Sequence, residues 1–147
     1  MTSAVAALGV VAGLIFSNAD QAKNILICVV GPTTGALTQY GDMMKEGIHT
    51  AVKHINTAGS VNGRMLENVA IDDGCEAKQG PIASNRVLNS KISFVVGYVC
   101  SSAAIAAAEI YNNEGVVMVM PSSTAPAVTD GKNCEFIFRT ICRGVNY

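Results

Sequence analysis

The sequence has little charge of either sign. Only 14% of its 147 residues are charged, the formal net charge is −1, and Lys and Arg stand singly along the chain. A protein that binds a polynucleotide through its phosphates needs a concentrated basic surface. We therefore expect no nucleic-acid partner. Half of the residues are hydrophobic, which is enough to build the core of one globular domain.

The sequence also lacks the common cofactor and catalytic motifs. It contains no G-x-G-x-x-G, G-x-x-x-x-G-K-[ST], G-x-S-x-G or H-E-x-x-H. A dinucleotide site, a nucleoside triphosphate site and an α/β-hydrolase triad are therefore disfavoured. His49 and His54 are five residues apart and do not share a helix face, so we expect surface histidines without a metal. We expect no cofactor and no enzyme activity.

The first 22 residues predict a leader. Ala4–Phe16 is an uncharged apolar run that is too short to span a bilayer as a helix, and small residues at Ala19 and Ala22 offer cleavage positions. Met1–Ser3 lacks the basic residue that usually precedes such a run. We interpret residues 1–22 as a signal peptide and expect a periplasmic or otherwise exported protein, with residues 23–147 forming one domain.

The cysteine count favours at least one free thiol in an oxidising compartment, because five cysteines cannot all pair within the chain. Cys28 lies inside an apolar run and is typical of a buried thiol. Cys75 and Cys100 each follow a predicted strand, so in a parallel sheet they would emerge at the same edge and could form a disulfide. The pattern gives Cys134 and Cys142 no role.

Apolar runs alternate with helical patterns along the chain. The runs at residues 25–30, 65–71, 92–97, 116–120 and 135–139 have the length of strands, and helical patterns begin at Asp42, Pro81 and Ser101. Continuous apolar strands separated by helices are typical of a parallel sheet that is covered on both faces. We therefore predict an α/β fold with a doubly wound open parallel sheet in three layers, αβα.

Small residues follow three of these strands, at residues 31–35, 98–102 and 121–124. In open α/β sheets, ligands bind beyond the carboxyl ends of the strands, so these stretches predict the site. Ser101 and Ser102 either cap the helix that they begin or offer hydroxyls to an anion such as a carboxylate. Tyr40 or Tyr98 would pack against an apolar ligand body.

An acidic pair, Asp72 and Asp73, directly follows the second predicted strand. Two adjacent carboxylates could hold a metal or act in catalysis, but at a strand end they more often cap turns or remain solvated. Because no partner acid or histidine is placed near them by the sequence, we favour the structural role.

Five ordered motifs carry a resemblance to a known family. They are ICVVGPTTGALTQYGD (residues 27–42), IDDGCEAKQ (71–79), VGYVCSS (96–102), IYNNEG (110–115) and MPSSTAP (120–126). Together they resemble the leucine/isoleucine/valine-binding proteins, which are receptors of branched-chain amino-acid ABC transporters with the type I periplasmic-binding-protein fold. The resemblance runs from Lys23 to Thr140.

The resemblance implies a set of ligand-binding residues. By similarity, Ser101 and the backbone around Cys100 would receive the ligand carboxylate, and Tyr40 would form an apolar wall. Ser122 would offer its carbonyl, and Thr124 its hydroxyl and amide, to the ammonium and carboxylate groups, with Ser123 in the same stretch. The family's disulfide falls on Cys75 and Cys100, which agrees with the pairing reached from strand order.

The sequence departs from this family at its end. Family members have two lobes, whereas this chain ends at Tyr147, and Ile141–Tyr147 no longer follows the pattern. We therefore expect the N-terminal lobe without the second lobe. The main hypothesis is a branched-chain amino-acid receptor that would dock on an ABC permease if a second lobe were supplied.

Two alternatives remain. One is a truncated remnant that folds without binding ligand and self-associates through an exposed apolar hinge edge. The other is an enzyme that uses Cys100 and Asp73, which we disfavour because a disulfide would consume the thiol.

Overall fold

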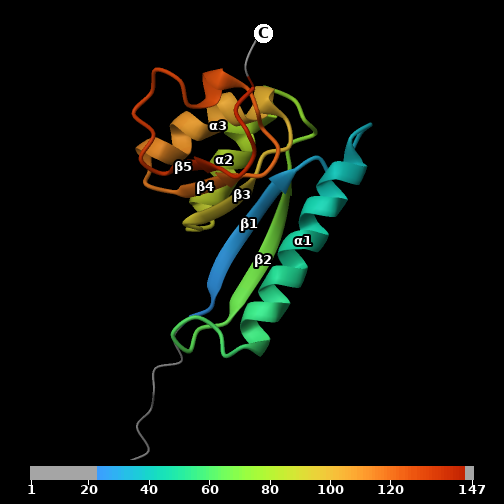
Figure 1. Cartoon of the computed structure of the whole chain (residues 1–147), viewed down its shortest axis with the longest axis vertical. Helices are drawn as coiled ribbons and strands as arrows, with labels where there is room; N and C mark the ends of the chain where they lie inside the picture. Colours follow the sequence, from blue (N-terminus) through green and yellow to red (C-terminus); the bar gives the residue numbers. More distant parts are fainter. Residues whose placement is uncertain (1–22, 145–147) are drawn as a thin grey trace, which may run out of the picture.

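The computed structural model describes residues 23–144, which form one open α/β sheet with helices on both of its faces (Figure 1). In chain order the elements are β1 (Ile25–Gly31), α1 (Thr38–Thr57), β2 (Leu66–Asp72), α2 (Gln79–Asn89), β3 (Phe94–Gly97), α3 (Ser101–Asn113), β4 (Val117–Met120), the short 3₁₀ helix η1 (Pro126–Val128) and β5 (Ile137–Arg139). The predicted signal peptide, residues 1–22, lies outside the described residues.

All five strands are parallel, in the order β2-β1-β3-β4-β5. The chain moves from β1 to β2 on one side, then returns across β1 to β3 and continues outward to β4 and β5. Since each crossover is right-handed, this reversal places α1 on one face and α2 and α3 on the other. The predicted doubly wound parallel sheet is confirmed.

The main core lies between the sheet and the face that carries α2 and α3. Cys28, Val95 and Met118 project from neighbouring strands onto the alanines of α3, all of them fully or almost fully buried. The two helices approach closely, because a Cβ placed at Gly80 would lie 2.3 Å from the carbonyl oxygen of Ala103. Small residues on both helices therefore allow a compact layer over the strands.

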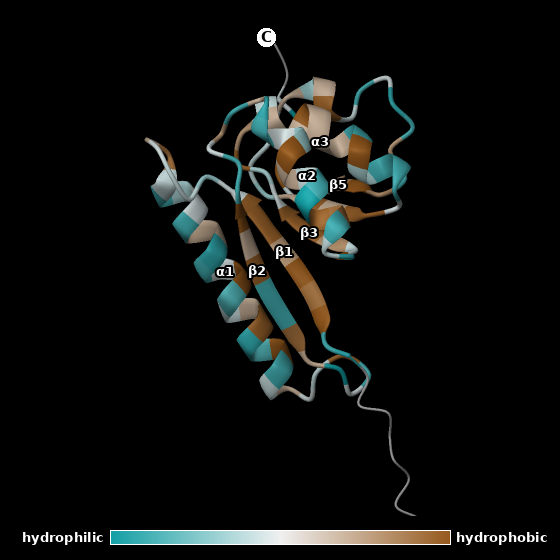
Figure 2. Ribbon diagram, turned by 180° about the vertical axis from the view of Figure 1, so that it is seen from behind, coloured by the Kyte–Doolittle hydropathy of each residue, from teal (hydrophilic) through white to brown (hydrophobic). Residues whose placement is uncertain are grey.

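The opposite face is covered only in part. Helix α1 packs on β1 and β2, where Val52 is buried and the Asn56 amide both donates to and accepts from the backbone of Leu66 at 2.8 Å. Beyond α1, Phe94 and Phe138 remain 45% and 51% exposed. In the hydropathy view β1 is hydrophobic along its length, whereas α1 is mixed (Figure 2).

Two helix starts differ from the predictions. Helix α1 begins at Thr38, so Asp42 is not its N-cap but lies in its second turn, in an ion pair with Lys45 at 2.7 Å. Helix α2 begins at Gln79 and includes Gly80 and Pro81. In both helices a glycine near the start is a close-packing position, since a Cβ at Gly41 would lie 1.9 Å from the Pro32 oxygen and a Cβ at Gly80 would lie 2.3 Å from the Ala103 oxygen. Within residues 23–144, no helix is both long and apolar enough to cross a membrane.

Candidate functional site

The site predicted from the sequence lies at the carboxyl edge of the sheet, where the direction of the strand order reverses between β1 and β3. The backbones are crowded here, because a Cβ at Gly97 would lie 2.2 Å from the carbonyl oxygen of Val30. The loops after β1 and β3 consequently leave the sheet side by side. This is the switch point at which open α/β sheets bind ligands.

The loop after β1 is held by Asp72, the last residue of β2. Its carboxylate accepts hydrogen bonds from the Thr33 backbone N–H at 2.7 Å and the Thr34 hydroxyl at 2.5 Å. It also accepts one from the Gly74 N–H at 3.1 Å. Burial opposes ionisation, but these donors outweigh it and lower the pKa of Asp72 to about 2. Asp72 thus has the turn-capping role that the sequence analysis favoured.

Helix α3 begins at Ser101 with Cys100 as its N-cap, and no side chain caps it. The Ser101 hydroxyl accepts a hydrogen bond from the Ala125 N–H at 3.2 Å, and the Ser102 hydroxyl donates to the Cys75 carbonyl at 3.5 Å. Neither serine therefore caps its own helix. Helix geometry leaves the N–H groups of the first turn without intrahelical acceptors, which favours an anion at this position.

The predicted disulfide between Cys75 and Cys100 is confirmed, with a Cα–Cα distance of 5.3 Å. It joins the loop after β2 to the start of α3, and the Ser102 hydrogen bond to Cys75 runs beside it. The Cys75 backbone adopts a left-handed conformation with φ of 60°. The covalent bond thus fixes the backbone that presents Ser101.

The three polar residues of the loop after β4 differ in how deeply they are buried. Ser122 is half-buried and Thr124 is exposed, whereas Ser123 is fully buried and its hydroxyl donates to the Tyr98 carbonyl at 2.8 Å. The Ser123 side chain therefore links the loops after β3 and β4 and does not line the surface. Ser122 and Thr124 keep accessible groups at the edge.

A shallow hollow of about 250 Å³ connects two of these loops. Its lining comes from the start of α1, the loop after β3 and the loop after β4, and comprises Tyr40, Met43, Met44, Val99, Pro121 and Ser122. Tyr40 is 46% exposed over this hollow. The structure thus brings Tyr40 and Ser122 together, with Ser101 and Thr124 linked nearby through the backbone of Ala125.

Tyr98 does not belong to this surface, and the prediction that it could pack against a ligand is wrong. Its side chain is fully buried beneath the edge, where its hydroxyl contacts the Tyr111 hydroxyl at 3.2 Å and the Ser84 hydroxyl at 3.4 Å. Burial raises the pKa of Tyr98 to about 12 and the pKa of Tyr111 further. Both rings therefore remain neutral parts of the core.

Asp73 is also buried, unlike its neighbour. One carboxylate oxygen accepts from the Cys75 N–H at 3.0 Å, and the other has no hydrogen-bond partner among the described residues. Burial raises the pKa of Asp73, and the nearby charge of Asp72 adds to the effect. Asp73 is sealed from solvent and the Cys100 sulfur is bonded to Cys75, so neither side chain is available as a base or a nucleophile in this structure.

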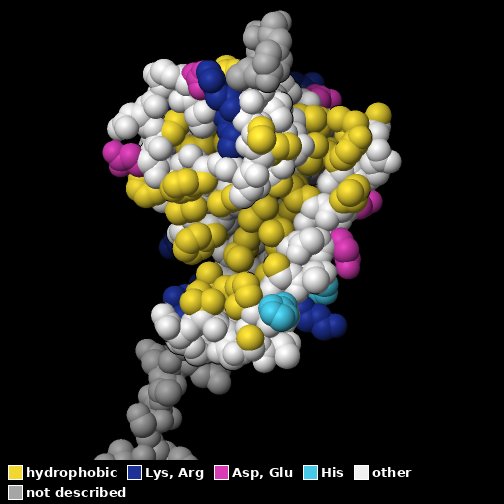
Figure 3. Space-filling view, viewed as in Figure 1, with side chains coloured by type: hydrophobic (Ala, Val, Ile, Leu, Met, Phe, Trp, Pro, Cys, Tyr) yellow, Lys and Arg dark blue, Asp and Glu magenta, His cyan; other side chains and the backbone are white. Residues whose placement is uncertain are grey.

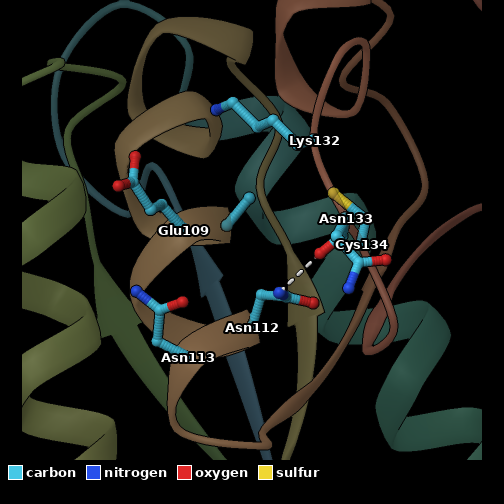
Figure 4. Close-up of a pocket in the computed structure, with 7 residues that line it drawn as sticks. Glu109, Asn112, Asn113, Lys132, Asn133 and Cys134 are labelled. Carbon is cyan, nitrogen blue, oxygen red and sulfur yellow. Dashed lines mark hydrogen bonds between the residues drawn. The ribbon is translucent and has the colours of Figure 1, made fainter.

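A second hollow, of about 420 Å³, lies between α3 and the loop before β5 (Figure 4). None of the predicted ligand residues lines it. Asn112 at its floor donates to the Asn133 carbonyl at 2.8 Å and accepts from the backbone N–H groups of Glu135 and Phe136. Both the nitrogen and the oxygen of the amide thus hold the loop before β5. The described residues contain no cluster of three or more potential metal ligands.

Arg139 is a residue at this edge that the sequence analysis did not identify. From the end of β5 its guanidinium donates to the carbonyl oxygens of Thr124 at 3.0 Å and Ala125 at 3.3 Å, and to the Thr129 hydroxyl at 2.9 Å. It therefore positions the loop that carries Thr124. In the sequence, this role could have been suspected only from the position of an arginine at the end of an otherwise apolar strand.

Comparisons with known proteins identify the family of this chain and several of its relatives. Residues 24–141 match the family described as periplasmic binding protein. Over 120 residues the chain is 48% identical to the leucine-, isoleucine-, valine-, threonine- and alanine-binding protein of Pseudomonas aeruginosa, covering 82% of this chain and 32% of that protein. It is 40% identical over 127 residues to the Leu/Ile/Val-binding protein of Escherichia coli K12, and the match covers 86% of this chain and 34% of that protein.

Solved structures of substrate-binding proteins also superpose on this chain. The branched-chain amino acid transporter substrate-binding protein of Streptococcus pneumoniae, in complex with isoleucine, superposes with a TM-score of 0.71 at 32% identity, covering 82% of this chain and 34% of that one. An ABC transporter substrate-binding protein of Desulfitobacterium hafniense in complex with Leu superposes with a TM-score of 0.69 at 36% identity. The match covers 82% of this chain and 35% of that one.

The chain spans about a third of the length of the relatives that it matches. The matched part contains the whole described sheet and the three loops at its carboxyl edge. The family resemblance seen in the sequence motifs is thereby confirmed, and the chain belongs to the periplasmic binding protein family.

Proposed function

We propose that the chain provides the N-terminal half-site of an exported receptor that binds branched-chain amino acids for an ABC importer, without catalysis. The observation that carries this proposal is the hydrogen bonding of Ser101. Its hydroxyl oxygen accepts from the Ala125 N–H, so its own proton is free to be donated. The open N–H groups at the start of α3 lie beside it and favour a carboxylate.

The remaining groups fit the other parts of an amino acid. Ser122 and Thr124 offer polar atoms for the ammonium and carboxylate groups, and the backbone at Cys100 belongs to the same helix start. Tyr40, with Met43 and Val99, provides an apolar wall for a branched side chain in the hollow of about 250 Å³. Ser123 acts indirectly, by holding the loop after β4 against Tyr98.

The context supports an exported receptor. The Cys75–Cys100 disulfide is characteristic of an oxidising compartment. The relatives in Pseudomonas aeruginosa and Escherichia coli are named as amino-acid-binding proteins, and the family is described as periplasmic. We infer that residues 1–22 direct export and that the complete receptor delivers its ligand to a membrane permease.

The test is a titration of the purified, non-reduced chain with leucine, isoleucine and valine, read by calorimetry and thermal shift, with a sugar as negative control. We expect saturable binding on the order of 1 mM, because one lobe supplies only part of the contacts and little desolvation. Ser101→Ala should abolish the response, whereas Ser102→Ala, whose hydroxyl contacts Cys75, should retain it.

The remnant hypothesis predicts the opposite result. A chain that is folded and monodisperse but shows no heat and no thermal shift with any of the three amino acids would support a lobe without a working site. Equal responses of the Ser101→Ala and Ser102→Ala variants would remove the role assigned to Ser101.

A further inference from the structure

The amino edge of the sheet gathers three cationic side chains that are far apart in the sequence. Lys23 precedes β1, Arg64 precedes β2 and Lys91 precedes β3. Because these strands are parallel neighbours in the order β2-β1-β3, they begin at the same edge and the segments before them lie side by side. This edge is opposite to the loops that carry Ser101 and Ser122.

The three cations line one hollow of about 220 Å³. Its wall comes from the starts of β1 and β3, the turn before β2 and the residues after α2, and it also includes the polar side chains of Asn24, Ser90 and Ser93. None of its described lining residues is acidic. In the space-filling view, dark-blue Lys and Arg atoms lie at the lower left, close to the end of the sheet at which β1 begins (Figure 3).

Arg64 is held in place at this hollow. Its Nε donates to the Lys23 carbonyl oxygen at 2.8 Å, which joins the segment before β1 to the turn before β2. That turn is closed by two backbone hydrogen bonds of 3.0 Å between Val61 and Arg64. The terminal N–H groups of the guanidinium have no acceptor among residues 23–144, so they remain available to a ligand.

The three cations have no acidic partner within the described part of the chain. The ion pairs of residues 23–144 lie elsewhere, at Asp42, Glu76 and Asp130. Glu67, at the start of β2, accepts a hydrogen bond from the Asn24 amide and forms no ion pair with Lys23, Arg64 or Lys91. Like charges around one hollow repel each other, and an anion between them relieves that repulsion.

Hydroxyl groups flank Lys91. Ser90 and Ser93 are exposed, and neither hydroxyl has a hydrogen-bond partner among the described residues. The hollow therefore combines a guanidinium fork, two ammonium groups and two hydroxyl donors. Charged donors of this kind, with the fork of an arginine among them, suit the several oxygens of a phosphate group.

We propose that this amino-edge hollow binds a phosphate group, supplied either by inorganic phosphate or by the headgroup of an anionic lipid. Both sources present the same oxygens to Arg64, Lys91 and Lys23. The lipid source enters because Lys23 directly follows the predicted signal peptide. The proposal does not depend on the amino-acid site, since none of the residues assigned to that site lines this hollow.

The first arm of the test titrates the full 147-residue, non-reduced chain with sodium phosphate at neutral pH, read by calorimetry. Sodium chloride at matched ionic strength is the reference. We expect saturable binding with a dissociation constant on the order of 1 mM, which chloride does not reproduce. Lys91→Gln and Arg64→Gln should each weaken binding by about tenfold, because each removes a charged donor.

Lys132→Gln is the matched control. Lys132 is an exposed lysine that forms no ion pair within residues 23–144, but it lines the separate hollow beside α3. This variant changes the net charge as Lys91→Gln does and should bind phosphate like the parent. Lys91→Arg keeps the charge and should also retain binding. Circular dichroism checks that every variant is folded.

The second arm identifies the source of the phosphate by co-sedimentation with lipid vesicles. It compares vesicles of phosphatidylcholine with vesicles that contain equal amounts of phosphatidylcholine and phosphatidylglycerol. Because the apolar run Ala4–Phe16 could enter either surface, only the difference between the two is scored. Excess binding to the anionic vesicles that Lys91→Gln removes and Lys132→Gln retains assigns the lipid source. Phosphate binding without such an excess assigns the free ion.

Three outcomes overturn the proposal. One is the absence of both a phosphate response and an excess on anionic vesicles. Another is binding that Lys91→Gln and Arg64→Gln leave unchanged, because the anion then lies elsewhere. The third is an equal loss in Lys132→Gln, which would make the effect one of net charge. None of these outcomes alters the leucine titration, so the two proposals fail separately.

Discussion

The guanidinium of Arg139 donates a hydrogen bond of 3.0 Å to the carbonyl oxygen of Thr124, which ties the last strand of the sheet to the loop after β4. The same side chain bonds to Ala125 and Thr129. Ala125 in turn donates to the Ser101 hydroxyl. A single arginine thus connects β5 to two of the predicted ligand-binding residues without itself lying on the ligand surface.

Replacing Arg139 should loosen this loop. Arg139→Met removes three hydrogen bonds, two of them partly buried, and we expect the free energy of unfolding to fall by about 2 kcal/mol in urea denaturation. Amide exchange at Ala125 should accelerate and the leucine response should weaken. Arg143→Met is the control, since Arg143 forms an ion pair with the exposed Asp130 at the surface, and it should cost less than about 1 kcal/mol.

The neighbouring carboxylates should respond to pH in opposite directions. The folded chain lowers the pKa of Asp72 from 3.8 to about 2, so its stabilising contribution is complete above pH 3.8 and is lost as the pH falls toward 2. The raised pKa of Asp73 has the reverse effect. Its ionised form is disfavoured in the folded state, so stability is lost as the pH rises from 3.8 through its folded pKa.

Two variants separate these effects. Asp73→Asn keeps an oxygen that can accept from the Cys75 N–H and removes a carboxyl group whose ionised form burial disfavours, so it should raise stability at pH 7 by about 1 kcal/mol. Asp72→Asn should lower stability at pH 7, because it weakens the bonds from Thr33 and Thr34. Thermal denaturation of the parent and both variants between pH 3 and pH 7 measures these changes in stability. A stabilising Asp72→Asn or a destabilising Asp73→Asn would contradict the assignment.

Removing the Cys75–Cys100 disulfide should lower the stability of the folded chain substantially. Cys75 and Cys100 are 25 residues apart, and for a loop of this length the chain-entropy argument gives about 3 to 4 kcal/mol of stabilisation. We expect the double variant Cys75→Ser/Cys100→Ser to melt well below the parent and to match the parent in reductant. The variant Cys134→Ser should melt like the parent, because Cys134 is a free thiol.

Two glycines of α1 should give opposite results when they are replaced by alanine. A Cβ at Gly41 would lie 1.9 Å from the Pro32 oxygen, so Gly41→Ala must push the helix start away from the loop after β1 and should destabilise by more than about 2 kcal/mol. Gly47 has no atom within 4 Å of its Cβ position, so Gly47→Ala should stabilise α1 by about 0.5–1 kcal/mol. Urea denaturation of both variants measures the contrast.

The strands and their order were predictable because the apolar runs are long, uncharged and separated by helical patterns. The residues next to a position predicted helix boundaries less well wherever a contact distant in the sequence determines the local structure. Gly80, next to Pro81, suggests a break when only its neighbours are considered, but it makes room for the backbone of Ala103 within α2. Gly41 makes room for the backbone of Pro32 in the same way within α1.

The site was predictable in its place but not in every side chain. Ser101, Tyr40 and Ser122 follow from strand order and from the family motifs. Tyr98 resembles an edge aromatic, yet its hydroxyl meets Tyr111, which lies 13 residues away. The partners of Ser123 and Arg139 are likewise distant in the sequence, at Tyr98 and Thr124, so no local pattern indicates that these side chains are structural.

The strand order sets the order in which the lobe can assemble. Strand β1 is synthesised first but lies inside the sheet, where Ile25 pairs with Leu66 on one side and Ile27 with Phe94 on the other. At ~5–20 residues per second of synthesis, one edge of β1 waits several seconds for β3 after β2 is already available. Strands β1 and β2 and helix α1 are therefore the first part of the sheet that is complete in the nascent chain. During that interval its unpaired edge is the part of the nascent chain most in need of protection from other strands.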